Sequence, residues 1–291
     1  TVEGSPETQL IMLLELIRLE PDNASAHVAR ARALLPECPP NPELFAQLAE
    51  LALRSSEFVT CMTAAKLAVA TAPRIPKPIP RLWRWFAAAE CAYGRALVAQ
   101  IDPDKHDKSA QDTLGLEGMG YFVRAALYAA EVPADGVMTV AAQHLWNAAV
   151  PFMTAAATRK VILPSLEKLV KCLAKVKVSD ETEEGVRALR VKLYVLLFEC
   201  LADSERWTDG LEATAKSLKV LPASCHKDLW DFRIRFMGRL GRDTAGELLK
   251  VKESGAEMVA KVLSTLAQAS TDRHQQLLAY QRAVESLAAQ P

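Results

Sequence analysis

The fold is decided by residues 41–73, which read NPELFAQLAELALRSSEFVTCMTAAKLAVATAP. Asn41 is a residue type that caps helices, Pro42 suits a first helical turn, and Glu43 is favoured beside the positive end of a helix dipole. Beyond them, apolar residues recur at steps of three and four, which is helical spacing. The stretch therefore predicts two helices joined by a short loop, which pair as an antiparallel hairpin.

Large and small residues follow one another in a fixed order along this pair. Numbered from Pro42, positions 4, 7, 8, 11, 20, 24, 27 and 32 hold Phe45, Leu48, Ala49, Ala52, Cys61, Ala65, Ala68 and Pro73. This order resembles a tetratricopeptide repeat, a 34-residue helix-turn-helix unit that stacks on its neighbours. Small residues at positions 8, 20 and 27 let the two helix axes approach closely, while the large residue at position 4 fills the groove beside them.

A second pair fits the same order less well. With Pro222 as the closing residue, positions 4, 7, 11 and 20 hold Tyr194, Leu197, Leu201 and Gly210, but Phe198 replaces the small residue at position 8. Helical spacing continues over almost the whole chain, and it predicts about fourteen helices and no sheet. The predicted fold is all-α, an α-solenoid of antiparallel helix pairs with degenerate tetratricopeptide-like repeats.

The pattern divides the chain into three sections. Residues 1–73 and 179–291 read as N-terminal and C-terminal helical repeats, and residues 74–178 as a middle section of longer helices. Within the middle section, residues 101–120 are polar and then glycine-containing, which predicts a loop insertion. Asp180 and Glu183 have the spacing of a capping box at the start of a helix. Apolar faces at 6–19 and 272–289 predict that the chain is a fragment of a larger array.

Composition narrows the class of protein. The chain has 291 residues, 35 basic and 35 acidic, so its formal net charge is zero, and half of its residues are hydrophobic. These values exclude a disordered chain and disfavour a DNA-binding domain. Alanine, with 47 residues, is the strongest helix former. The six cysteines form no Cys-x-x-Cys pair and sit mostly in apolar helical stretches, which favours a reducing, cytoplasmic location.

A narrower resemblance covers the C-terminal section. Its residues lie at 189–194, 197–203, 207–213, 221–222 and 229–232. They resemble the degenerate helical-repeat region of large cilia- and flagella-associated scaffold proteins of the axonemal central apparatus. The resemblance implies a microtubule-associated scaffold in the axoneme of a cilium or flagellum. Its partners would be other proteins of a large complex, including tubulin or microtubule-associated proteins.

The sequence offers little catalytic chemistry. His-Glu-x-x-His and Gly-x-Ser-x-Gly are absent, and the glycine spacing at 241–246 lacks the lysine of a phosphate loop, so a helix–helix turn is predicted there. The acidic run Asp102–Asp107 does not match a calcium loop and predicts a solvated loop. His144 and Asn147 predict a hydrogen-bonded pair in an apolar helix. We therefore expect no catalytic residue, cofactor or metal, and no enzyme.

Two alternatives remain open at this stage. An all-helical enzyme would need polar residues that converge from facing helices, and only His144, Asn147 and the aspartate loop are available for that. An adaptor domain in trafficking would have the same fold with different partners.

Two groups of basic residues are candidates for partner binding. They are Lys168, Lys171 and Lys175 along one predicted helix, and Arg233, Arg235 and Arg239 along another. Such residues often form ordinary solvated faces, but they can also attract the acidic surface of a protein such as tubulin. Zero net charge and few paired aromatic residues argue against nucleic acid. No run of 18 apolar residues occurs, so we expect no membrane partner.

Overall fold

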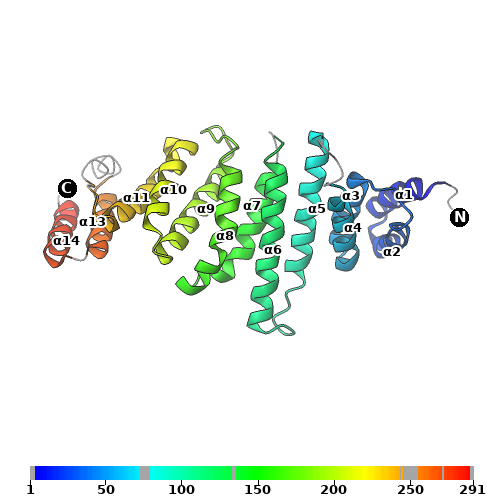
Figure 1. Cartoon of the computed structure of the whole chain (residues 1–291), viewed down its shortest axis with the longest axis horizontal. Coiled ribbons are helices and arrows are strands. Elements are labelled where there is room, and N and C mark those ends of the chain that lie inside the picture. The colour runs from blue at the N-terminus through cyan, green and yellow to red at the C-terminus, as the bar shows by residue number, and fades with distance from the viewer. Residues whose placement is uncertain are drawn as a thin grey trace. The chain divides into compact units, whose positions relative to one another are not determined.

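The computed structural model of the chain describes residues 4–72, 79–132, 136–242, 244, 255–270 and 272–288. Over these residues it contains thirteen α-helices, three short 3-10 helices and no strand, so the all-α prediction is confirmed (Figure 1). The α-helices are α1 (Pro6–Leu19), α2 (Ala24–Leu34), α3 (Pro42–Arg54), α4 (Phe58–Ala70), α5 (Pro80–Ala99), α6 (Lys108–Ala129), α7 (Gly136–Ala149), α8 (Ala156–Leu173), α9 (Glu184–Asp203), α10 (Trp207–Val220), α11 (Lys227–Arg239), α13 (Ala256–Ala269) and α14 (Arg273–Ala288). The 3-10 helices are η1 (Pro21–Asn23), η3 (Val150–Phe152) and η4 (Ala223–Cys225).

The helices group into two compact units. The first consists of residues 1–151 with 171–176, and the second of residues 152–170 with 177–291. In the first unit, α3 packs on α4 and α5, and α5 packs on α4, α6 and α7. In the second unit, α9, α10 and α11 pack on one another, and α11 packs on α13. The three sections expected from the repeat pattern are not tested by this division and stay a prediction.

Side-chain caps fix where several helices of the first unit begin. The Asn41 side chain accepts a hydrogen bond from the backbone N–H of Leu44 at 3.3 Å, and Pro42 occupies the first helical position, as the sequence predicted. Asp107 does the same at α6 by accepting from the N–H of Ala110 at 2.7 Å. Each cap satisfies a backbone donor that the first helical turn leaves without a partner.

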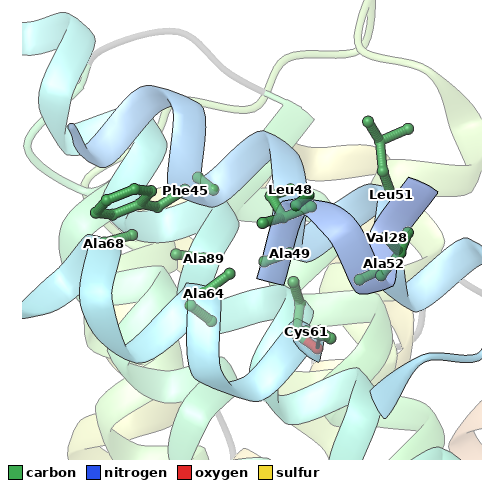
Figure 2. Packing of buried hydrophobic residues seen from close by; sticks show 14 of the residues in the cluster. Val28, Phe45, Leu48, Ala49, Leu51, Ala52, Cys61, Ala64, Ala68 and Ala89 are labelled. Atoms are coloured by element: carbon green, nitrogen blue, oxygen red, sulfur yellow. Dashed lines mark hydrogen bonds between the residues drawn. The ribbon is translucent and has the colours of Figure 1, made fainter. Parts of the chain in front are cut away.

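Alanine and other small residues form much of the core of the first unit. Figure 2 shows Phe45, Leu48 and Ala49 of α3 packed with Ala64 and Ala68 of α4. The residues assigned to tetratricopeptide positions 4 to 27 are all buried; they are Phe45, Leu48, Ala49, Ala52, Cys61, Ala65 and Ala68. Pro73, the closing residue of the pattern, lies outside the described residues. Because alanine has only a methyl side chain, the axes of α3, α4 and α5 can approach closely at these positions.

The two helix pairs recognised in the sequence share one turn geometry. Between α3 and α4, Ser56 adopts a left-handed conformation (φ 59°), and the N–H of Glu57 donates to the carbonyl of Ala52 at 2.8 Å. Between α9 and α10, Glu205 does the same (φ 56°), and the N–H of Arg206 donates at 2.9 Å to the carbonyl five residues earlier. This six-to-one bond is the Schellman ending of a helix. Both pairs are therefore joined in the same way.

In the second pair, the small residue at position 20 lies against the helix that follows the pair. A Cβ atom on Gly210 of α10 would lie 2.5 Å from the ring of Phe236 on α11, so only glycine leaves room for that ring. Tyr194, Leu197 and Phe198 of α9 are all buried. The large Phe198, which breaks the pattern at position 8, packs against the rings of Phe232 and Phe236, with centroids 5.5 and 6.2 Å away.

The loop insertion predicted at 101–120 is wrong over most of its length. Of the residues in that range, only 101–107 lie outside a helix, because α6 begins at Lys108. The glycines that indicated a loop lie inside α6. A Cβ atom on Gly94 of α5 would lie 2.7 Å from the Phe122 ring and 3.0 Å from the Gly118 carbonyl oxygen. Gly118 is therefore part of a close contact between two helix backbones, which sequence spacing alone does not reveal.

The capping box predicted for Asp180 and Glu183 is also wrong. Helix α9 begins at Glu184 with Glu183 in the capping position, and no side chain there accepts a capping hydrogen bond. Asp180 lies before the helix, where it pairs with Arg187 at 3.4 Å and accepts a hydrogen bond from the Ser224 hydroxyl. Its carboxylate therefore ties the start of α9 to the segment that precedes α11.

The close contact of α5 and α6 can be tested with two alanine substitutions. Gly→Ala in a helix normally stabilises by about 1 kcal/mol. Gly120→Ala should show that gain, because its Cβ would meet only the tip of Arg124, 4.0 Å away. Gly94→Ala should instead lose about 1–3 kcal/mol through overpacking against Phe122 and the Gly118 backbone. Urea denaturation followed by circular dichroism measures both midpoints. Equal stabilisation by the two substitutions would contradict the close contact between α5 and α6.

Candidate interaction surfaces

The predicted lysines lie at and just beyond the end of α8. Lys168, Lys171 and Lys175 are all exposed. Lys168 and Lys171 lie on the helix, but Lys175 follows its end at Leu173 and pairs with Glu131 at 3.2 Å. Lys168 groups with the second unit, and Lys171 and Lys175 group with the first. A binding stripe across all three stays a prediction, and the structure shows that Lys175 already has an acidic neighbour.

The predicted arginines lie on α11 and do not share one face. Successive helical residues are about 100° apart, so Arg235 and Arg239 lie close in angle and Arg233 lies about 200° from Arg235. Arg233 and Arg235 are half-buried, and Arg239 is exposed. The Arg239 guanidinium lies 5.3 Å from the centroid of the Trp207 ring on α10. Its side chain therefore contacts α10, and the structure does not bring the three arginines together.

The prediction of a hydrogen bond between His144 and Asn147 is wrong, because each side chain has a different neighbour. The exposed Asn147 side chain accepts a hydrogen bond from the Gln143 amide at 3.0 Å. His144 is half-buried on α7, and its ring stacks on Phe122 of α6 with centroids 5.6 Å apart. Burial, followed by the positive charge of Arg95, lowers the pKa of His144. The ring packs as an aromatic side chain between two helices, and no polar pair forms.

The aspartate loop between α5 and α6 is held by local contacts. Asp102 pairs with Lys105 at 2.8 Å and accepts a hydrogen bond from the backbone N–H of Asp104. The N–H of Asp102 in turn donates to the ring of His106 at 3.1 Å. Across the described ranges, no group of three or more histidine, cysteine, aspartate or glutamate residues is placed to hold a metal ion.

A surface cavity of about 260 Å³ lies where α4, α5 and α6 meet. Its lining is mostly small or aromatic and consists of Ala65, Lys66, Val69, Ala70, Ala89, Glu90, Tyr93 and Tyr121. The rings of Tyr93 and Tyr121 stack with centroids 4.0 Å apart. A cation lies beside each ring: the Lys66 ammonium is 5.3 Å from the Tyr93 centroid, and the Arg124 guanidinium is 3.9 Å from the Tyr121 centroid.

One carboxylate lies in this cavity, and it already has a partner. Glu90 is only 5% exposed, and its two carboxylate oxygens accept hydrogen bonds from the Nε of Arg124 at 3.1 and 3.0 Å. Burial raises the pKa of Glu90, and Arg124 opposes that shift. Burial and then contact with Tyr93 raise the pKa of Tyr121 to about 12, so its hydroxyl stays protonated at neutral pH. The cavity therefore presents a largely apolar surface.

Two helices near the ends of the described chain expose apolar side chains. Ile11, Met12 and Leu19 of α1 are exposed. On α14, Leu277, Tyr280, Val284 and Leu287 are exposed and repeat at steps of three and four. These are the apolar faces that the sequence indicated at 6–19 and 272–289. No helix among the described residues is long and apolar enough to cross a membrane.

The sequence analysis did not predict the residues around the cavity. The Tyr93–Tyr121 stack depends on how α5 packs on α6, and no local spacing reports that contact. Helix α4, however, carries a visible signal. Lys66 is its only charged residue among thirteen, although a helix on the surface of a protein normally has a polar face.

The effect of burying His144 can be tested through pH. Because the folded-state pKa lies below the unfolded value of about 6.5, the unfolded state takes up the proton first as pH falls. Stability should therefore fall between about pH 7 and pH 5, and His144→Phe, which keeps the aromatic contact, should reduce that loss. His274→Gln, at an exposed position, is the control. Urea midpoints across this range give the comparison, and unchanged pH dependence in His144→Phe would refute it.

The chain was compared with known proteins, and no family model matches it. It is similar to cilia- and flagella-associated protein 46 of Chlamydomonas reinhardtii, with 28% identity. The similarity covers 90% of this chain and 10% of that protein, so the chain spans about a tenth of the length of the curated relative it matches. The resemblance to large cilia- and flagella-associated proteins that the sequence indicated is confirmed by this relative.

Proposed function

We propose that the chain is a protein–protein interaction scaffold within a ciliary or axonemal assembly, and that it has no catalytic role. The observation that carries the proposal is its similarity, over 90% of its length, to a protein named for its association with cilia and flagella. The all-helical fold agrees with a scaffold, because paired helices present extended surfaces without requiring a buried reaction site.

The finer architecture in this proposal is an α-solenoid of tetratricopeptide-like helix pairs. Two features support it. The α3–α4 and α9–α10 pairs have the same left-handed turn residue and the same Schellman bond. Both pairs also bury a small residue at position 20, Cys61 in the first and Gly210 in the second. Repeated units of this kind stack on their neighbours and share a continuous core.

The proposed partners are other proteins of a large complex, including tubulin or microtubule-associated proteins, and not nucleic acid or membrane. Their acidic surfaces would attract the exposed Lys168 and Lys171. Lys175 contributes less in this scheme, because Glu131 lies 3.2 Å from its ammonium group. The proposed location is the cytoplasm, within the axoneme of a cilium or flagellum.

Fractionation of cilia tests the location and the charge attraction together. The endogenous protein that contains this chain, carrying a tag, should remain with axonemes after extraction with a non-ionic detergent. Lys168→Glu with Lys171→Glu should release it at a lower salt concentration, because the attraction between exposed charges is screened by salt. Lys192→Glu, at an exposed position on α9, is the matched control.

Two outcomes would count against the proposal. Recovery of the unmodified protein in the detergent-soluble fraction would exclude an axonemal scaffold. Equal salt release of the double variant and the Lys192→Glu control would exclude Lys168 and Lys171 as a docking surface, and the axonemal location would still stand.

Small-angle X-ray scattering tests the solenoid. A compact domain of 291 residues has a radius of gyration of about 19 Å. A row of stacked helix pairs is longer than it is wide, so the measured value should lie clearly above that figure. A value close to 19 Å would rule out the solenoid.

A further inference from the structure

Helix α4 exposes an apolar face. Cys61, Ala64 and Ala68 point into the core, and the opposite side carries Val59, Thr63, Lys66, Leu67 and Ala70 at steps of three and four. Val59 is 55% exposed and Leu67 is 37% exposed. The Thr63 hydroxyl donates to the Val59 carbonyl at 2.8 Å, so it is satisfied within the helix. A surface helix with one charge in thirteen residues is suited to being covered by another apolar surface.

The cavity between α4, α5 and α6 opens beside this face, because Lys66 and Ala70 belong to both. Its volume of about 260 Å³ falls below the range of about 300–1,000 Å³ that is usual for small-molecule sites. The fully buried Ala89 and the stacked rings of Tyr93 and Tyr121 make its lining apolar. A cavity of this size and chemistry fits one large apolar side chain.

Charge narrows the identity of the occupant. Glu90 and Arg124 neutralise one another, which leaves Lys66 as the charge at the edge of the cavity. Lys66 lies beside the Tyr93 ring, and no carboxylate pairs with it among the residues that the structure describes. The Lys66 side chain is exposed, so its ammonium group remains able to bind a carboxylate.

We propose that the exposed face of α4 and the adjoining cavity bind an amphipathic helix of another protein. A large apolar side chain of that helix enters the cavity, and an aspartate or glutamate within one turn of it pairs with Lys66. This is helix-in-groove recognition, in which residues spaced by three and four act as anchors. The inference rests on the proposed scaffold function and assigns it one surface and one kind of partner.

A second copy of the chain is a poorer occupant. In a two-fold symmetric contact the same patch faces itself. Lys66 is the only charge on α4, so in such a contact neither helix would offer a carboxylate to the lysine of the other. Like charges across an interface disfavour association, and opposite charges favour it. A helix that carries an aspartate or glutamate therefore complements Lys66, and α4 does not.

A displayed library of 18-residue helical peptides, randomised on one face, tests the proposal with the whole chain as the target. Selected peptides should carry a large apolar residue within one turn of an aspartate or glutamate. The best fluorescent peptide should bind Lys66→Glu and Ala70→Trp at least about tenfold more weakly, as measured by anisotropy. A variant of this peptide with lysine in place of its aspartate or glutamate should regain affinity for Lys66→Glu. Lys192→Glu should bind like the unmodified chain.

Several outcomes would overturn the proposal. The selection could yield no binder, or the selected peptides could lack an acidic residue. Ala70→Trp could leave the affinity of the peptide unchanged. Sedimentation equilibrium could show a dimer of the chain that Leu67→Gln dissociates. Positions 66, 67 and 70 are exposed, so these variants should fold, and circular dichroism checks that they do. If no peptide binds while the full protein stays with axonemes, this inference fails and the ciliary scaffold stands. If a peptide binds as expected while the full protein does not stay with axonemes, the ciliary proposal fails and this inference stands.

Discussion

Where α5 contacts α6, the space beside Gly94 is so small that a single added carbon would lie 2.7 Å from Phe122 and 3.0 Å from the Gly118 carbonyl oxygen. Other helix contacts also have small residues where a larger side chain would not fit. Ala49 and Ala52 of α3 and Ala89 of α5 are fully buried, and Gly210 of α10 leaves room for Phe236. Interhelical distances of about 8–10 Å depend on the side chains at the contact, so small residues there allow the helices to pack closely. The abundance of alanine in the sequence therefore serves packing as well as helix formation.

The sequence predicted the helices well because their signals are local. Asn41 and Pro42 start α3 where expected, and every described residue assigned to the first repeat pattern is buried. The errors arose where a partner helix decides the outcome. Glycines at 115–120 favour a loop by propensity, but they lie inside α6, where Gly118 packs against α5. Asp180 had the spacing of a capping box, yet its carboxylate pairs with Arg187 and accepts a hydrogen bond from Ser224 of η4.

Candidate binding residues were harder to predict, because sequence shows a charge without showing what surrounds it. Lys168 and Lys171 proved exposed, whereas Lys175 has Glu131 beside it and Arg239 lies against Trp207. The cavity beside α4 needs three helices to form, so no local motif could reveal it. The lack of charge on α4 was visible in the sequence, but its meaning depended on knowing that Val59 and Leu67 remain exposed in the fold.

Several ion pairs join helices of the first unit to one another. Glu50 pairs with Arg95 at 2.9 Å between α3 and α5, and Glu90 pairs with Arg124 between α5 and α6. Helix α4 takes no part in these pairs, and its exposed face is apolar with one lysine, Lys66. Binding there would gain most of its free energy from apolar burial, which salt weakens little, whereas binding through Lys168 and Lys171 would weaken steeply with salt. The two proposed surfaces thus differ in physical character, and a single scaffold could use them for partners of different strength and lifetime.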